Sequence, residues 1–235
     1  MKPRKELMHS VSIEDFIKTI YLINQDEQVR VSGKLLAERL QVSSAAVTDM
    51  ARKLDEKGLI IYQKYKALEL TESGRLMALK LVRRHRLWEL FLHQVLEMDL
   101  QQVHKEAEQL EHQTSDALIT AMDRFLEHPQ FDPHGDPIPG ADGQLPQREQ
   151  VVKLSKLPVG HYRIARLTYS HSDLAAFYQR HQLALDMTIQ LIQRFELDAS
   201  VEIKANKHTI VVNKNMADHI YCEDIDNGIV SEKSD

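Results

Sequence analysis

The sequence predicts a mainly α-helical protein that ends in a small β domain. Apolar residues recur at helical spacing through most of residues 12–127, whereas short runs with strand-like alternation dominate from residue 151 onward. Between these parts, residues 129–150 hold five of the seven prolines and three of the eight glycines. Such a composition interrupts regular structure, so this segment is expected to be a linker.

Two helices are expected near the amino terminus. Apolar positions in residues 12–25 predict the first helix, with Ser12 as its N-cap. A second, shorter helix is expected over residues 31–40, with Ser32 as the capping residue.

A third helix and a β-hairpin should follow. Either Ser43 or Ser44 caps this helix, and Gly58 ends it. Residues 60–71 then alternate like two strands around a turn near residues 64–67. A helix, a helix-turn-helix and a hairpin in this order are typical of a winged helix, which is a DNA-binding unit.

The middle of the chain predicts a helical part. Thr71 is expected to cap a long helix that runs to Leu96, and further helices should begin at Leu100 and cover residues 115–127. Apolar residues are dense in the first of these helices: Leu87, Trp88, Phe91 and Leu92. Because a small winged helix cannot cover so much apolar surface, we expect these helices to form a homodimer interface.

The last part of the chain predicts a small β-barrel. Strands are expected at residues 162–168, 188–195, 201–205 and 208–212, with a helical segment near residues 173–181. The polar tail from Asp224 is expected to be disordered.

The composition is that of an intracellular globular protein. With 43% hydrophobic residues the 235-residue chain can build a core, and its single cysteine, Cys222, excludes an internal disulfide and disfavours a thiolate-rich zinc site. No apolar run reaches transmembrane length, and the charged stretch Met1–Glu6 is not followed by the apolar segment of a signal peptide. We therefore expect a cytoplasmic protein with no membrane partner.

Charge is unevenly distributed along the chain. Residues 1–86 carry 17 basic and 11 acidic side chains, a net charge of +6, whereas residues 87–235 carry 13 and 24, a net charge of −11. A basic amino-terminal part on an acidic protein indicates that this part meets a polyanion.

The predicted helix-turn-helix offers side chains for contacts with double-stranded DNA. Its second helix would enter the major groove, where small and hydroxyl side chains permit close approach and basic side chains neutralise phosphates. The candidates are Ser43, Ser44, Ala45, Thr48, Asp49, Arg52, Lys53, Lys64 and Lys66. No Arg or Lys lies in the first turn, so bidentate guanine recognition is not evident. A winged helix that contacts only protein is the alternative.

Histidines and carboxylates with metal-ligand spacing follow in the helical part. His104, Glu108, Glu111 and His112 lie at i, i+4, i+7 and i+8, which would place all four on one face of an α-helix. Two further pairs are His85 with Glu89 and Asp132 with His134. A solvated, salt-bridged helix explains one such pair, but three clusters in consecutive segments favour a divalent-metal site.

At this point the sequence resembles the DtxR/MntR-like metal-dependent transcriptional repressors. The resemblance covers nearly the whole chain and is sharpest in E-D-F-I-K-T-I-Y, S-S-A-A-V-T-D-M-A-R-K-L, I-Y-Q-K-Y-K-A-L-E-L-T, R-R-H-R-L-W-E-L-F-L, V-H-K-E-A-E-Q-L-E-H and D-P-H-G-D-P-I-P. It implies a winged helix (1–73), a helical metal-binding and dimerisation domain (74–140), a linker (141–150), an SH3-like (FeoA-like) barrel (151–223) and a tail (224–235).

The resemblance also implies the metal ligands. The primary site would comprise Asp15, Glu108, Glu111 and His112. An ancillary site would draw on His85, Glu89 and His104, with Asp132, His134, His171 and Asp173 as further candidates. Lys18 departs from the short manganese regulators, which carry a carboxylate there, so two separated sites are favoured over a two-metal cluster.

Donor chemistry indicates which metal the family resemblance implies. Iron-responsive members tend to carry Met and Cys where this chain has Asp15 and Glu108, and hard Mn²⁺ prefers oxygen donors. We therefore expect a Mn²⁺-activated repressor of metal-uptake genes that binds operator DNA as a homodimer, with an Fe²⁺-responsive regulator as the alternative. A metal-dependent hydrolase is disfavoured because the chain lacks a nucleophile array, a Gly-rich phosphate loop and H-E-x-x-H. A structural adaptor with solvated charged helices also remains open.

Overall fold

The computed structural model describes residues 13–26, 29–64, 66–146, 151–169 and 171–225. The predicted N-cap Ser12 and the tail beyond residue 225 lie outside these residues. The chain forms two compact units, one made of residues up to 85 together with 139–144, the other of residues 86–138 and 145 onward. Within the described residues, no helix has the length and apolar character needed to cross a membrane.

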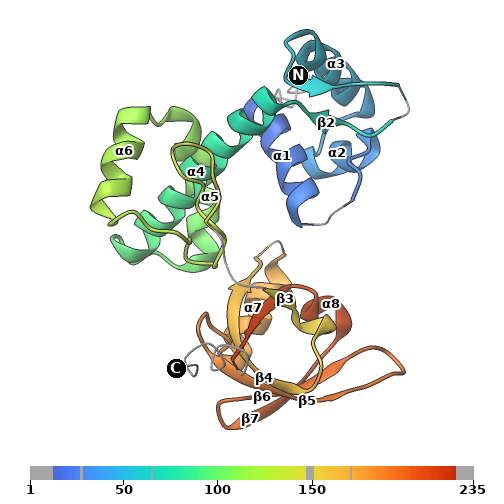
Figure 1. Cartoon of the computed structure of the whole chain (residues 1–235), viewed down its shortest axis with the longest axis vertical. Helices are drawn as coiled ribbons and strands as arrows, with labels where there is room; N and C mark the ends of the chain where they lie inside the picture. The colour runs from blue at the N-terminus through green and yellow to red at the C-terminus, as the bar shows by residue number, and fades with distance from the viewer. Residues whose placement is uncertain (1–12, 27–28, 65, 147–150, 170, 226–235) are drawn as a thin grey trace, which may run out of the picture. The chain divides into compact units, whose positions relative to one another are not determined.

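The first unit contains the predicted winged helix. Its elements are α1 (Ile13–Asp26), α2 (Gly33–Leu40), α3 (Ser44–Glu56), β1 (Ile60–Ile61) and β2 (Glu69–Leu70) (Figure 1). The two strands pair antiparallel, and buried apolar side chains from the three helices form one core. The hydroxyl oxygens of Ser32 and Ser43 accept hydrogen bonds from the backbone of α2 and α3, as predicted. Of the two proposed caps for α3, Ser43 is therefore the one used.

The helical part contains α4 (Glu72–Gln94), α5 (Leu100–Leu110), the 3₁₀ helix η1 (Glu111–Gln113) and α6 (Asp116–Phe125). The boundary between the two units falls between His85 and Arg86, inside the continuous helix α4. The prediction that one α-helix continues through His112 is wrong, because α5 ends at Leu110. The hydroxyl of Thr114 donates to the carbonyl of Leu110 across 2.6 Å, which satisfies a carbonyl at the helix end.

The carboxyl-terminal part is one antiparallel six-stranded sheet with the order β3-β8-β4-β5-β6-β7. Its elements are β3 (Val152–Lys153), η2 (Leu154–Lys156), β4 (Gly160–Leu167), α7 (Ser172–His181), β5 (Thr188–Arg194), β6 (Val201–Ala205), β7 (His208–Val212), α8 (Lys214–Ala217) and β8 (Ile220–Asp224). A single apolar core lies inside it. Helical units followed by this sheet confirm the predicted fold class.

Residues 129–146 differ from the expected loose linker, because they form a packed segment. Asp132, His134 and Ile138 are buried, and Phe131 pairs with Pro137 in an isolated bridge. The segment also contacts β4, where the backbone N–H of Leu167 donates to the carbonyl of His134 across 3.0 Å. Its prolines and glycines therefore shape turns rather than loosen the chain.

Gly135 permits the closest approach in this segment. Its φ of +86° lies in the left-handed region, and a Cβ atom at this position would lie 2.2 Å from the carbonyl oxygen of Ala165. Any larger residue would have to push the segment away from β4. The turn that carries His134 is thus held against the sheet by a contact that only glycine allows.

Candidate metal centre

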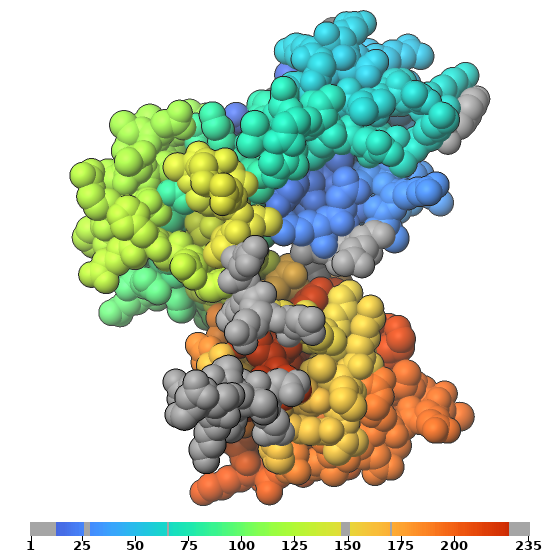
Figure 2. Space-filling view, viewed as in Figure 1, coloured from blue at the N-terminus to red at the C-terminus, as the bar shows by residue number. Residues whose placement is uncertain are grey.

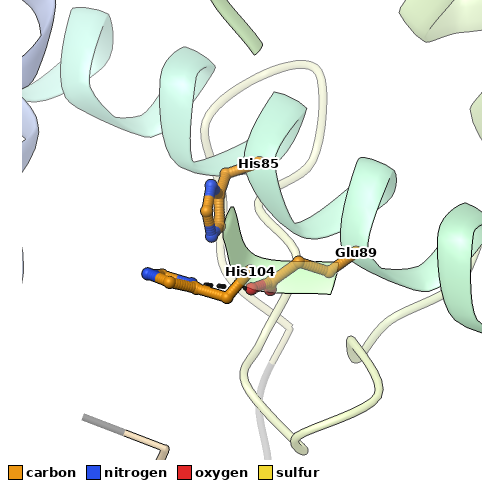
Figure 3. A group of neighbouring side chains, drawn as sticks. All are labelled: His85, Glu89 and His104. Atoms are coloured by element: carbon orange, nitrogen blue, oxygen red, sulfur yellow. Dashed lines mark hydrogen bonds and ion pairs between the residues drawn. The ribbon is translucent and has the colours of Figure 1, made fainter. Parts of the chain in front are cut away.

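Three of the predicted ancillary ligands meet where α4 and α5 face each other. His85 and Glu89 lie one turn apart on α4, and His104 approaches from α5 (Figure 3). Each can place one ligand atom within 4.8 Å of the others. His104 Nδ1 lies 2.9 Å from Glu89 Oε1, so the carboxylate already contacts one imidazole. We refer to these three residues as the α4–α5 group.

The two α4 members of this group are buried, whereas the α5 member reaches solvent. Glu89 and His85 are 2% and 6% exposed, and the His104 side chain is 62% exposed. Burial of a carboxylate is costly unless opposite charge or hydrogen-bond donors accompany it. A cation that enters past His104 would meet a carboxylate already withdrawn from water.

His134 lies beside the α4–α5 group. Its Nε2 is 3.8 Å from Glu89 Oε1, and its ring packs against Tyr169 with the centroids 4.5 Å apart. The segment that docks on β4 therefore brings the imidazole of His134 close to Glu89, as a candidate fourth donor beside the three residues of the α4–α5 group. A ligand role for the D-P-H-G stretch at an ancillary site stays a prediction.

Asp132 has a different role from His134 in the structure. Its Oδ1 accepts hydrogen bonds from the backbone N–H groups of His134 and Asp136, at 2.8 and 2.9 Å. Its Oδ2 lies 3.7 Å from Nε of Arg86. Burial, followed by the nearby carboxylates of Asp136 and Glu89, raises the pKa of Asp132 well above its usual value, although Arg86 opposes this shift. Asp132 thus holds the turn that presents His134.

Two arginines link this turn to its surroundings. Arg86 on α4 also lies 3.6 Å from Asp136 Oδ1, and it donates to the carbonyl of Pro137. Arg166 on β4 lies 2.6 Å from the same Asp136 oxygen. Nothing in the sequence pointed to Arg166. For Arg86 the only signal was its position directly after His85, a predicted ligand.

Lys18 on α1 contacts one of the predicted ligands. Its Nζ lies 3.2 Å from His85 Nδ1, and both side chains are buried. The sequence identified Lys18 only as a departure from the family pattern. The contact with His85 could not be read from the sequence, because 67 positions separate the two residues.

The predicted primary ligands of the second unit gather where α5 ends. Glu108 lies in the last turn of α5, and Glu111 and His112 follow in η1. These three residues, the α5–η1 group, can also place ligand atoms within 4.8 Å of one another. Glu111 is fully buried, and its Oε1 lies 3.5 Å from His112 Nε2. Asp15, the fourth predicted ligand, lies in the first turn of α1 in the first unit.

The four residues that the sequence placed on one helix face do not form a single donor group. His104 does not share one donor group with the three later residues, because it pairs with Glu89 on α4. The four residues at i, i+4, i+7 and i+8 therefore divide into two groups. The prediction of one shared donor group is therefore wrong, and the assignment of the two groups to two metal sites stays a prediction.

His171 and Asp173 lie at the exposed amino end of α7. His171 Nδ1 accepts a hydrogen bond from the backbone N–H of Asp173, and it lies 3.5 Å from that residue's carboxylate. Both side chains are mostly exposed. Neither belongs to the two donor groups found among the described residues, so their role as ligands stays a prediction.

The donor chemistry of both groups suits a hard or borderline divalent cation. Every donor is a carboxylate or an imidazole. The single cysteine, Cys222, is buried in the core of the β domain, where burial raises the pKa of its thiol to about 12. It cannot act as a thiolate ligand there. The residues present therefore fit Mn²⁺ or Fe²⁺ better than a sulfur-preferring metal.

The proposed DNA-contacting side chains are accessible in the first unit. Ser43, Ser44, Ala45, Asp49, Arg52, Lys53, Lys64 and Lys66 are exposed, and Thr48 is partly exposed. Two hydroxyls already serve α3, since Ser43 caps it and Thr48 donates to the carbonyl of Ser44 at 2.9 Å. Lys53 lies 2.9 Å from Asp49 in a solvent-exposed ion pair, which costs little to break on binding a phosphate.

A winged helix and two groups of carboxylate and imidazole donors are the parts of a metal-regulated DNA-binding protein. Comparison with known proteins agrees. The model of the iron dependent repressor N-terminal DNA binding domain matches residues 8–68. The model of the iron dependent repressor metal binding and dimerisation domain matches residues 71–140.

Individual relatives extend the match to most of the chain. The diphtheria toxin repressor of Corynebacterium glutamicum is 26% identical over 224 residues, which are 94% of this chain and 95% of that protein. Iron-dependent repressor IdeR of Mycobacterium tuberculosis is 33% identical over 153 residues, 63% of this chain and 66% of that protein. A solved structure of a manganese-dependent transcriptional repressor in complex with manganese is 36% identical, covers 91% of this chain and 100% of its own, and has a TM-score of 0.84.

The chain therefore belongs to the diphtheria toxin repressor family of metal-dependent transcriptional repressors. Family membership places it among DNA-binding repressors and not among metal-dependent hydrolases, which agrees with the sequence-based prediction. It also confirms the predicted winged helix with an adjoining metal-binding and dimerisation domain.

Proposed function

We propose that this chain is a Mn²⁺-activated repressor of genes for metal-ion uptake. The observation that carries the proposal is the donor set, in which the fully buried Glu111 lies close to Glu108 and His112 with no sulfur atom among the donors. Oxygen-rich sites suit Mn²⁺, while iron-responsive relatives are expected to use sulfur at two of these positions. The likeness to a manganese-dependent repressor over 91% of the chain supports the same choice.

We assign two sites to the two donor groups. The switching site comprises the α5–η1 group together with Asp15 from the winged helix. The side site comprises the α4–α5 group together with His134. Asp132, His171 and Asp173 remain further candidates for the side site.

The switching mechanism follows from where the ligands lie in the chain. Glu108 and Glu111 belong to the helical part, whereas Asp15 belongs to α1 of the winged helix. Without a cation, neighbouring carboxylates repel one another, which disfavours a fixed joint between the two parts. A bound divalent cation supplies the positive charge that lets these carboxylates come together. The winged helices of a dimer would then take one orientation toward operator DNA.

Metal and DNA must assist each other reciprocally in this scheme, because allostery is a coupling free energy between two sites. The test is the affinity for a duplex that spans the protein's own promoter, measured by fluorescence anisotropy without metal and with Mn²⁺, anaerobic Fe²⁺ or Zn²⁺. Tighter binding with Mn²⁺ at lower metal concentration than with Fe²⁺ supports the proposal. Equal affinity with and without any metal contradicts it, and a response to Fe²⁺ alone favours the iron-responsive alternative.

A further inference from the structure

Lys18 is a buried lysine that contacts His85, one of the ligands proposed for the side site. Its Nζ lies 3.2 Å from Nδ1 of His85, and the two residues are only 5% and 6% exposed. Both belong to the first unit, Lys18 in the middle of α1 and His85 on α4. Water is therefore largely excluded from a contact between an amine and a proposed metal ligand.

The hydrogen-bonding capacity of the two groups determines the tautomer of the imidazole. A protonated lysine has three donors and no acceptor, so Nδ1 of His85 must accept the hydrogen bond. A neutral imidazole that accepts at Nδ1 carries its proton on Nε2. Histidines that bind metal show the opposite arrangement at the remote nitrogen, whose N–H usually donates to a carboxylate, a carbonyl or water.

Metal ligation by His85 conflicts with Lys18 whichever nitrogen is used. If Nδ1 binds the metal, Lys18 already occupies its lone pair. If Nε2 binds the metal, the proton must move to Nδ1, where it would face the lysine donor. Figure 3 shows the two ring nitrogens of His85 on opposite sides of the ring, one of them turned toward Glu89 and His104.

We propose that Lys18 competes with the metal for His85 and thereby sets the affinity of the side site. This inference rests on the proposed function, because it assumes that the α4–α5 group binds metal. Lys18 must leave His85 before His85 can serve as a ligand, and its positive charge opposes a cation nearby. The side site therefore fills only at a higher metal concentration than the switching site.

The competition also connects the side site to the winged helix. Lys18 follows Asp15 by three residues on α1, so the same helix carries a switching-site ligand and the competitor of the side site. Filling the side site removes one contact between α1 and α4. Lys18 is a positioning residue in this sense, because it acts on the metal through His85.

The first test measures Mn²⁺ binding at the side site alone. In a background with Glu111→Ala and His112→Ala, free Mn²⁺ is followed by its electron paramagnetic resonance signal during titration. Lys18→Gln supplies an amide oxygen that can accept a hydrogen bond from the Nδ1–H of His85, so Mn²⁺ affinity should rise tenfold or more. Lys18→Met removes the charge without adding a hydrogen-bond acceptor, so it should raise Mn²⁺ affinity by less than Lys18→Gln does. Lys18→Arg keeps a donor-only cation and should bind Mn²⁺ as weakly as the parent.

Two outcomes separate the failure of this inference from the failure of the proposed site. If Glu89→Gln in the same background leaves Mn²⁺ binding unchanged, the side site itself is wrong. If Glu89→Gln abolishes binding while Lys18→Gln and Lys18→Met bind like the parent, the competition is wrong. Circular dichroism shows whether each variant is folded.

A second measurement needs no change at Lys18. Long-range ¹H–¹⁵N correlation spectra of metal-free protein with ¹⁵N-labelled histidine report the tautomer of each ring, and His85→Gln assigns the signal. The expected result for His85 is a proton on Nε2 and a bare Nδ1. A proton on Nδ1 in the metal-free protein would overturn the inference even if no Lys18 variant folds.

Discussion

Trp88 donates its indole N–H to the hydroxyl oxygen of Thr114 across 2.7 Å. That hydroxyl donates in turn to the carbonyl of Leu110, the last residue of α5. This relay joins α4 to the point where α5 becomes η1, one residue before the buried Glu111. It connects the apolar core of the helical part to the geometry of the proposed switching site.

Replacing Thr114 by Val should loosen this site while keeping its side-chain shape. The change leaves the partly buried indole N–H of Trp88 without its acceptor, which costs about 1 kcal/mol of stability. Calorimetric titration should show weaker Mn²⁺ binding, and thermal unfolding a lower midpoint. Thr120→Val is the matched control, since Thr120 also donates to a carbonyl four residues earlier but lies exposed on α6. Equal effects of the two variants would contradict the role given to the relay.

Lys53→Ala and Lys66→Ala should weaken binding to DNA of any sequence. Each lost phosphate contact is expected to lower the slope of log affinity against log salt by about one unit. Thr48→Ala should instead reduce affinity more for the promoter duplex than for random DNA. Lys204→Ala provides a control, because Lys204 is an exposed lysine of the β domain. An unchanged salt slope for Lys53→Ala would show that this helix does not dock as proposed.

Asp15→Met combined with Glu108→Cys should shift the metal response from Mn²⁺ toward Fe²⁺ or later metals. The reason is donor softness, because thioether and thiolate ligands favour later metals over Mn²⁺. The measurement is the metal concentration that gives half-maximal promoter binding for each ion. Gln109→Cys adds a thiol on the same helix outside the donor group. It should leave the order of preference among the metal ions unchanged. If the double variant keeps the parent's preference, selectivity resides elsewhere.

Much of the fold could be predicted from local sequence signals. Ser32 and Ser43 are confirmed as helix caps because N-capping depends on a few adjacent residues. The short β3 and β8 were missed, since each is stabilised mainly by pairing with strands distant in the sequence. The packed segment around Gly135 was mistaken for a linker for the same reason, because its partner is β4.

The candidate site was predictable in its residue types but not in its grouping. Spacing on an ideal helix placed His104 with Glu108, whereas in the structure His104 groups with His85 and Glu89 of α4 and Glu108 groups with the residues of η1. The tertiary contact of His104 with Glu89 spans 15 positions, so the local spacing could not reveal it. The contact between Lys18 and His85 also depends on tertiary packing and left no local signal.

The helical part should form the predicted homodimer through apolar surface that the monomer leaves exposed. Phe125 on α6 is 63% exposed, although its ring lies 6.0 Å from that of Phe91. A charge placed in an apolar interface is costly, so Phe125→Glu should shift the protein from dimer to monomer in light scattering at micromolar concentration. Leu197→Glu is the control, since Leu197 in the β domain is 99% exposed. A monomeric parent protein, with and without Mn²⁺, would contradict the prediction.

The two proposed sites should respond differently to the loss of a histidine. His112→Ala should abolish metal-dependent promoter binding, because His112 contacts the buried Glu111 in the group that we assign to the switch. His134→Ala should only weaken it, because His134 approaches Glu89 from the segment docked on β4 and supports the side site. Promoter affinity at saturating Mn²⁺ separates the two roles, with circular dichroism to verify the fold. If folded His134→Ala is as inactive as His112→Ala, the division into a switching site and a supporting side site is mistaken.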